Sequence, residues 1–67
     1  MTYRIEREGL SFFAVNTVTG WKSLRFTSAS QAGLVIERAA TKAHGRKAGQ
    51  AAHRAAYEDF IVTGGVA

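Results

Sequence analysis

Apolar and polar residues alternate along the first 26 positions with the two-residue period of half-buried β-strands. The pattern is seen in Tyr3–Arg7, Ser11–Val15 and Trp21–Phe26, which are rich in aromatic and β-branched side chains. Gly9 separates the first two segments, and the loop Asn16–Gly20 separates the second from the third. Because short connections join antiparallel neighbours, the pattern predicts a three-stranded antiparallel β-meander.

The hydrophobic period changes to that of a helix after residue 27. Ser28 followed by Gln31 has the spacing of a capping box, and apolar residues then recur three and four positions apart. Gly45 favours a helix end at that point, and the Ala-rich segment 46–62 predicts a second helix. A single helix over 29–62 is the alternative, although each interior Gly costs about 1 kcal/mol relative to Ala.

These elements define an α+β fold, a three-stranded antiparallel meander followed by one or two helices, in one small domain of 67 residues. The strands occupy about 2–27, the helices about 29–62, and a tail over 63–67 is predicted to fray. A chain of this length buries only about 60% of its unfolded surface, so its core is small. The chain contains no Cys, which excludes disulfides, thiol catalysis and thiolate metal sites.

Strand alternation also assigns side chains to the two faces of the sheet. The face predicted to lie under the first helix carries Tyr3, Ile5, Phe13, Val15, Leu24 and Phe26. The opposite face then carries Arg4, Glu6, Phe12, Ala14, Trp21, Ser23 and Arg25.

Aromatic and Arg side chains share that opposite face. Trp and Arg are enriched at interface hot spots, and aromatic residues beside cations also suit base stacking. We therefore treat Arg4, Phe12, Trp21 and Arg25 as candidate partner-binding residues. Two alternatives stay open: the second helix covers this face as core, or two copies of the chain pair there as a homodimer.

Positive charge is concentrated in the middle of the chain. The net charge is +4, and residues 21–54 hold seven Lys and Arg side chains against a single Glu. Such a segment indicates an anionic partner, either nucleic acid or an acidic protein surface, with a solvated helix face as the alternative. Three of the cations align at i, i+4 and i+8 if one helix continues that far. The candidate residues are Arg38, Lys42, Arg46, Lys47 and Arg54.

No residue pattern indicates catalysis, and we expect no enzyme activity, metal or cofactor. His44 and His53 lie nine positions apart without a nearby third ligand. Asp59 is the only Asp, and its neighbour Glu58 diverges from it on a helix, unlike a catalytic carboxylate pair. No phosphate-binding loop of the Walker type is present.

The longest strictly apolar stretch is Leu34–Ile36, and the N-terminus lacks the features of a secretion signal. We therefore expect no membrane contact, a location in the bacterial cytoplasm, and a complete small reading frame starting at Met1.

The first forty residues resemble short β-β-β-α modules of phage and prophage reading frames. The residues that carry the resemblance are Tyr3–Ile5, Gly9, Phe13, Val15, Gly20, Phe26–Ser28 and Ala32. The same segment is similar to the N-terminal domains of some phage-type integrases. Those domains lay their sheet on DNA. In size and organisation the chain also resembles the small phage proteins that disarm host defences, such as anti-CRISPR proteins.

These resemblances imply a non-enzymatic interaction protein of phage or mobile-element type. It would bind and block a host protein or nucleoprotein complex that handles nucleic acid or serves defence. The alternative is an accessory protein that binds DNA or RNA directly through its basic helical residues.

Overall fold

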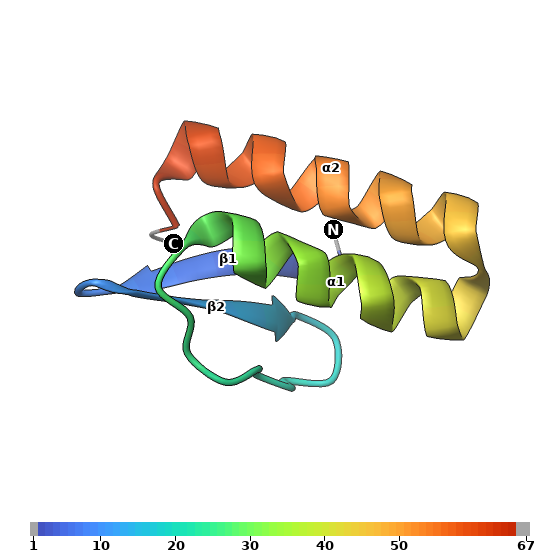
Figure 1. Ribbon diagram of the computed structural model, residues 1–67, viewed down its shortest axis with the longest axis horizontal. Helices are drawn as coiled ribbons and strands as arrows, with labels where there is room; N and C mark the ends of the chain where they lie inside the picture. The colour runs from blue at the N-terminus through green and yellow to red at the C-terminus, as the bar shows by residue number, and fades with distance from the viewer. Residues whose placement is uncertain (1, 66–67) are drawn as a thin grey trace.

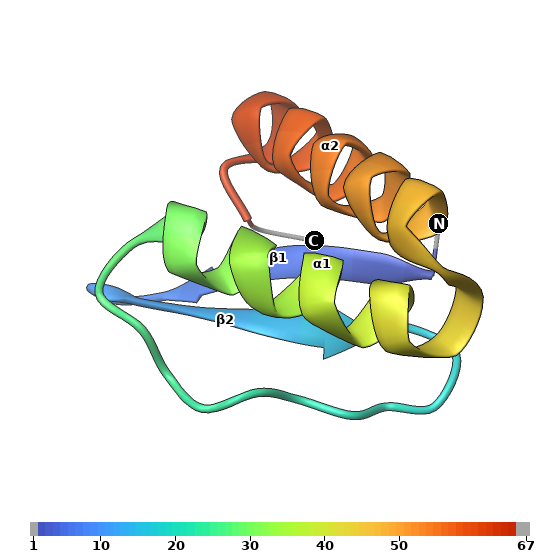
Figure 2. The ribbon, with the colours of Figure 1, turned by 45° about the vertical axis from the view of Figure 1, so that its right-hand side comes forward.

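Two strands and two helices follow one another in the structure, a computed structural model that describes residues 2–65. Their order is β1 (Tyr3–Glu8), β2 (Ser11–Asn16), α1 (Ala29–His44) and α2 (Arg46–Thr63). The α+β class is therefore confirmed. Both helices lie on the same side of the β-hairpin, where they run antiparallel to each other (Figures 1 and 2).

The hairpin pairs β1 with β2 so that Ile5 lies opposite Ala14. Its turn consists of Gly9 and Leu10, and Gly9 has φ of 64°. A positive φ at the first position of a two-residue turn suits the twist of a β-hairpin and favours Gly there. The sequence pattern predicts this part of the fold correctly.

The prediction of a third strand over Trp21–Phe26 is wrong, because this segment does not form a regular strand. The segment follows β2 but touches it only through the bridges Val15–Lys22 and Phe12–Phe26. Between these bridges the segment contains one residue more than β2, which is the geometry of a β-bulge. At the bulge the Ser23 hydroxyl, instead of a carbonyl, accepts the Ala14 N–H at 2.8 Å, and this interrupts the ladder.

The predicted assignment of side chains to sheet faces is also wrong for β2. Ile5 and Ala14 lie opposite each other and are fully buried beneath the helices, with Phe12 packed against the same cluster. Phe13 and Val15 are buried but do not belong to this cluster. The error arises because alternation gives the period of a strand and leaves its register with the partner strand undetermined.

The predicted inward position of Leu24 is wrong as well. Leu24 and Phe26 are two positions apart and would share a face in a regular strand, but the extra residue between the two bridges breaks this alternation. Leu24 is 82% exposed, whereas Phe26 packs against the core as predicted.

The two helices are separate, so the alternative of one long helix is wrong. Gly45 has φ of 97°, a region that L side chains rarely adopt, and the chain changes direction there. At the start of α1, Ser28 accepts the N–H of Gln31 as the capping-box spacing predicts. The Gln31 side chain accepts the N–H of Thr27, one residue before the position expected.

The helices approach each other closely where Gly residues face the partner helix. A Cβ built on Gly49 would lie 1.8 Å from Thr41 Oγ1 and 2.7 Å from the carbonyl oxygen of Glu37. One on Gly33 would lie 2.6 Å from His53 Nε2. Ala32, Ile36 and Ala56 fill the space between this contact and the sheet.

The end of α2 is tied to the sheet, whereas the sequence predicts a tail that frays from residue 63. Thr63 is helical, and Gly64 closes the helix in the left-handed conformation by donating its N–H to Phe60. The carbonyl of Gly65 accepts the N–H of Arg7 at 3.2 Å. Residues 66–67 of the predicted tail lie outside the described residues.

The contact at Gly49 gives a first test of the fold. We expect Gly49→Ala to lower the free energy of unfolding by about 1–2 kcal/mol, since overpacking outweighs the better helix propensity of Ala. Chemical denaturation followed by circular dichroism measures the change. Gln50→Ala, at the adjacent exposed position, is the matched control and should leave stability unchanged or slightly higher. Full wild-type stability in Gly49→Ala would contradict the close helix contact.

Candidate functional site

The structure does not gather the predicted partner-binding residues Arg4, Phe12, Trp21 and Arg25 into one face. Phe12 packs under the helices, with its ring edge-to-face against Phe60 at 5.7 Å between centroids. Arg25 is exposed and forms an ion pair with Glu8 at 2.7 Å. These two side chains therefore have structural partners within the chain.

Arg4 connects the hairpin to α2. Its Nε lies 3.5 Å from Oδ2 of Asp59, and both atoms are buried. Neither atom has a hydrogen-bond partner within residues 2–65. Because the two charges are near each other and partly shielded from water, their attraction holds β1 against α2. This placement favours a structural role for Arg4.

Trp21 alone among these four offers free apolar surface. Its side chain is 44% exposed and lines a recess of about 420 Å³ beside α1. Leu24, Phe26 and Val35 line the same recess. The recess lies next to the bulged segment, so its position depends on the extra residue there.

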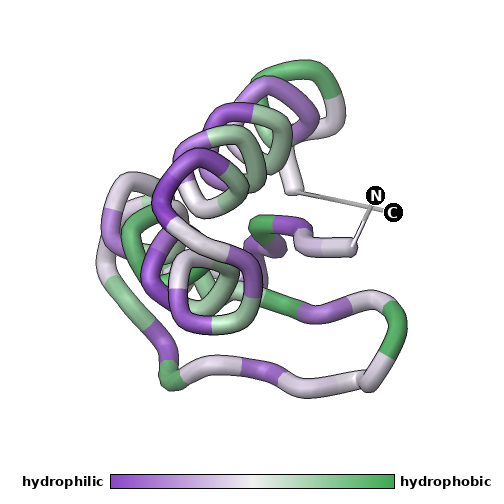
Figure 3. Tube along the Cα trace, turned by 90° about the vertical axis from the view of Figure 1, so that its right-hand side faces the viewer, coloured by the Kyte–Doolittle hydropathy of each residue, from purple (hydrophilic) through white to green (hydrophobic). Residues whose placement is uncertain are grey.

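The basic candidates on the helices are all exposed. They are Arg38 and Lys42 on α1, and Arg46, Lys47 and Arg54 on α2. Hydrophilic residues recur along both helices in the tube view (Figure 3). Their alignment differs from the prediction, because Gly45 separates Arg46 from the helix that carries Arg38 and Lys42. Lys47 and Arg54, seven positions apart, share one face of α2 instead.

None of these five cations forms an ion pair with another described residue. The acids that do pair, Glu8, Glu37 and Asp59, contact Arg25, His53 and Arg4. Three of the five acidic side chains therefore contact residues outside this set of cations. The positive potential of the helical cations is left to act on the solvent and on anything that approaches.

The connection between the helices has the highest density of positive charge. Lys42 and His44 lie in the last turn of α1, and Arg46 and Lys47 begin α2. No side chain caps the N-terminus of α2, and its first turn contains no acid. The partial positive charge of a helix N-terminus thus adds to that of the side chains.

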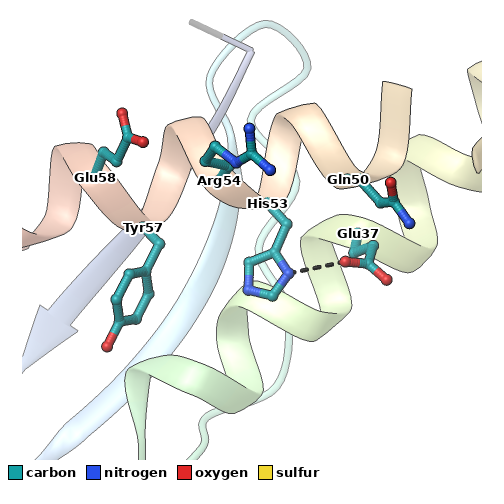
Figure 4. Close-up of a pocket in the computed structure, with 6 residues that line it drawn as sticks. All are labelled: Glu37, Gln50, His53, Arg54, Tyr57 and Glu58. Atoms are coloured by element: carbon teal, nitrogen blue, oxygen red, sulfur yellow. Dashed lines mark hydrogen bonds and ion pairs between the residues drawn. The ribbon is translucent and has the colours of Figure 1, made fainter. Parts of the chain in front are cut away.

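A groove of about 630 Å³ lies between the helices, lined by Glu37, Gln50, His53, Arg54, Tyr57 and Glu58 (Figure 4). Glu37 Oε1 lies 2.9 Å from Nδ1 of His53, which fixes the imidazole ring against α1. The other ring nitrogen faces the backbone of Gly33. Tyr57 is the one hydroxyl-bearing side chain among these lining residues.

Sequence reasoning missed this pair. In the sequence, His53 has no third metal ligand nearby, and Glu37 is the single acid of the basic segment 21–54. A signal was available, because Glu37 and His53 are each eight residues from Gly45. In two antiparallel helices joined at Gly45, residues at equal distances from the turn lie side by side.

Two further properties of the described chain concern metal binding and membrane crossing. Within residues 2–65, no three His, Asp or Glu side chains are grouped so that they could hold a metal ion. Neither described helix combines the length and the apolar character that crossing a membrane requires. Comparison with protein-family models, curated proteins and solved structures finds no match to this chain.

The contrast between Phe12 and Trp21 can be tested by truncation. We expect Phe12→Ala to lower the free energy of unfolding by about 3 kcal/mol, because it opens a cavity beneath the helices. Trp21→Ala should cost less than about 1 kcal/mol, since its side chain is half-exposed. Urea denaturation of both variants and the wild type gives the comparison. Equal losses would mean that Trp21 belongs to the core.

Proposed function

We propose that this protein is a non-enzymatic binding protein whose exposed helical cations contact the phosphates of a nucleic acid. One observation carries the proposal. The five Lys and Arg candidates on α1 and α2 are all exposed and unpaired among the described residues, while three acids pair elsewhere. From the sequence alone, inhibition of a host complex is the first expectation, and direct nucleic-acid binding is the alternative.

The placement of the cations supports contacts with the nucleic-acid backbone. Each Lys or Arg that neutralises a phosphate releases condensed counterions, and this release dominates affinity at low salt. Contacts to phosphates position a protein without reading sequence. The proposed interaction is therefore strong at low ionic strength and tolerant of sequence.

The test compares two variants with the same change in net charge. Lys42→Gln with Lys47→Gln neutralises two cations near the helix connection. Arg7→Gln with Arg25→Gln neutralises two exposed cations on the sheet side. We expect only the helical variant to weaken binding to a mixed-sequence oligonucleotide. Its slope of log affinity against log salt should fall by about 1.4–1.8, the value for two lost phosphate contacts.

Fluorescence anisotropy between about 50 and 200 mM salt measures both quantities. Equal weakening by the two variants would show that net charge alone matters. The absence of binding by the wild type at the lower salt would contradict the proposal itself.

A second candidate function is inhibition of a host nucleoprotein or defence complex, as the resemblance to small phage proteins implies. The observation that favours it is the recess beside Trp21, with the exposed Leu24 at its rim. An exposed Trp next to an apolar recess is typical of a binding hot spot. The helical cations would then face an acidic or phosphate-bearing surface of the same complex.

This candidate is tested by DNA cleavage in a reconstituted RNA-guided nuclease. If it is right, wild-type protein should reduce cleavage. The double variant Trp21→Ala with Leu24→Ser should need at least a tenfold higher concentration for the same inhibition. Val18→Ser is the matched control, because Val18 is 78% exposed and lies outside the recess. Restoration by the control, or no inhibition by the wild type, would count against this function for the nuclease tested.

A further inference from the structure

The groove between α1 and α2 adjoins two of the cations in the proposed phosphate-binding surface. Gln50, Arg54 and Tyr57 reach it from successive turns of α2. Lys47, seven residues before Arg54, lies on the same face of the helix. A polyanion that follows the exposed face of α2 would therefore pass along the groove.

Tyr57 presents an aromatic ring in this groove. The side chain is 38% exposed, and its ring projects from α2 toward α1 (Figure 4). Phe60 lies 6.4 Å from it between ring centroids, tilted by 35°. That neighbour limits the movement of the ring and leaves part of its surface accessible. An accessible ring beside a cation is the arrangement on which bases of single-stranded nucleic acid stack.

The opposite wall of the groove is held in place by the contact between Glu37 and His53. The 2.9 Å contact joins α1 to α2, and the imidazole packs over Gly33. The Gln50 amide supplies a donor and an acceptor at the same groove. Glu58 also lines the groove, and it lies on the same side of α2 as Arg54, away from Tyr57 (Figure 4). The groove is thus polar at its edges and aromatic at one end.

We infer that the groove receives a base of single-stranded nucleic acid, stacked on Tyr57, with the adjoining phosphate on Arg54. The inference rests on the proposed function and specifies its ligand. A base inside a duplex is already stacked and paired, so its face is not available to Tyr57 without unpairing. A single strand offers its bases freely, and stacking tolerates any sequence.

The experiment uses three fluorescent probes: a single-stranded oligonucleotide, an abasic strand of equal length and charge, and the corresponding duplex. Electrostatic contacts are the same for the first two probes, so any difference between them reports the bases. We expect the wild type to bind the strand with bases about tenfold more tightly than the abasic strand. It should also prefer that strand to the duplex.

Variants at Tyr57 assign the difference to this groove. Tyr57→Leu should remove most of the tenfold preference and leave affinity for the abasic strand unchanged. Tyr57→Phe, which keeps the ring, should retain the preference. A strand carrying 2-aminopurine should lose fluorescence on binding to the wild type and to Tyr57→Phe, and much less with Tyr57→Leu. If Tyr57→Leu fails to fold, a single strand carrying 5-iodouracil is photo-cross-linked to the wild type instead, and a cross-link that misses Tyr57 and its groove overturns the inference.

The possible results separate the inference from the function on which it rests. Equal, salt-dependent affinity for the abasic strand and the strand with bases would overturn stacking but support phosphate binding. Tighter binding to the duplex would overturn it in the same way. No binding to any probe at about 50 mM salt would overturn both. A preference for bases that survives Tyr57→Leu would place the stacking site elsewhere and overturn the inference.

Discussion

The close contact between α1 and α2 is the constraint on which the rest of this small fold depends. Gly49 faces Thr41 and the Glu37 carbonyl across the contact, and Gly33 faces His53. Neither position has room for a methyl group without movement. Because the helices lie this near each other, they cover the two-stranded hairpin together and bury Ile5 completely. A hairpin alone would be marginal in water, so the helix pair supplies most of the core.

The same contact divides the charged residues into two groups. Arg4 and His53 meet acidic partners where elements touch, and these contacts join α2 to β1 and to α1. The cations on the solvent side of the helices form no ion pair with an acid among the described residues. The charges that join elements are therefore distinct residues from the exposed cations of the helices, although Arg54 lines the same groove as Glu37 and His53. A surface of this kind can change its affinity for anions with little effect on folding.

The sequence predicts the hairpin and both helices because their signals are local. Gly9 sets the turn, Ser28 starts α1, and Gly45 ends it. The prediction of a third strand fails because the bulge at Ser23 depends on one hydroxyl that accepts a backbone N–H from another segment. Likewise, the cations of the two helices are exposed, whereas the aromatic candidates Phe12 and Trp21 separate once the register of the hairpin is fixed. Long-range pairing, which composition and periodicity do not encode, accounts for both differences.

The Gly residues of the helix pair also bear on how distant relatives of this chain could be identified. Gly33 and Gly49 are fixed by lack of space, and Gly45 by its φ of 97°. Exposed Lys and Arg side chains face no such limit and can move from turn to turn during evolution. A chain that shares the three Gly positions, at intervals of twelve and four residues, would thus share the scaffold even with a different charge pattern. Common ancestry would then be visible in the Gly residues of the helix contact, and differences in binding would be visible in the exposed residues around it.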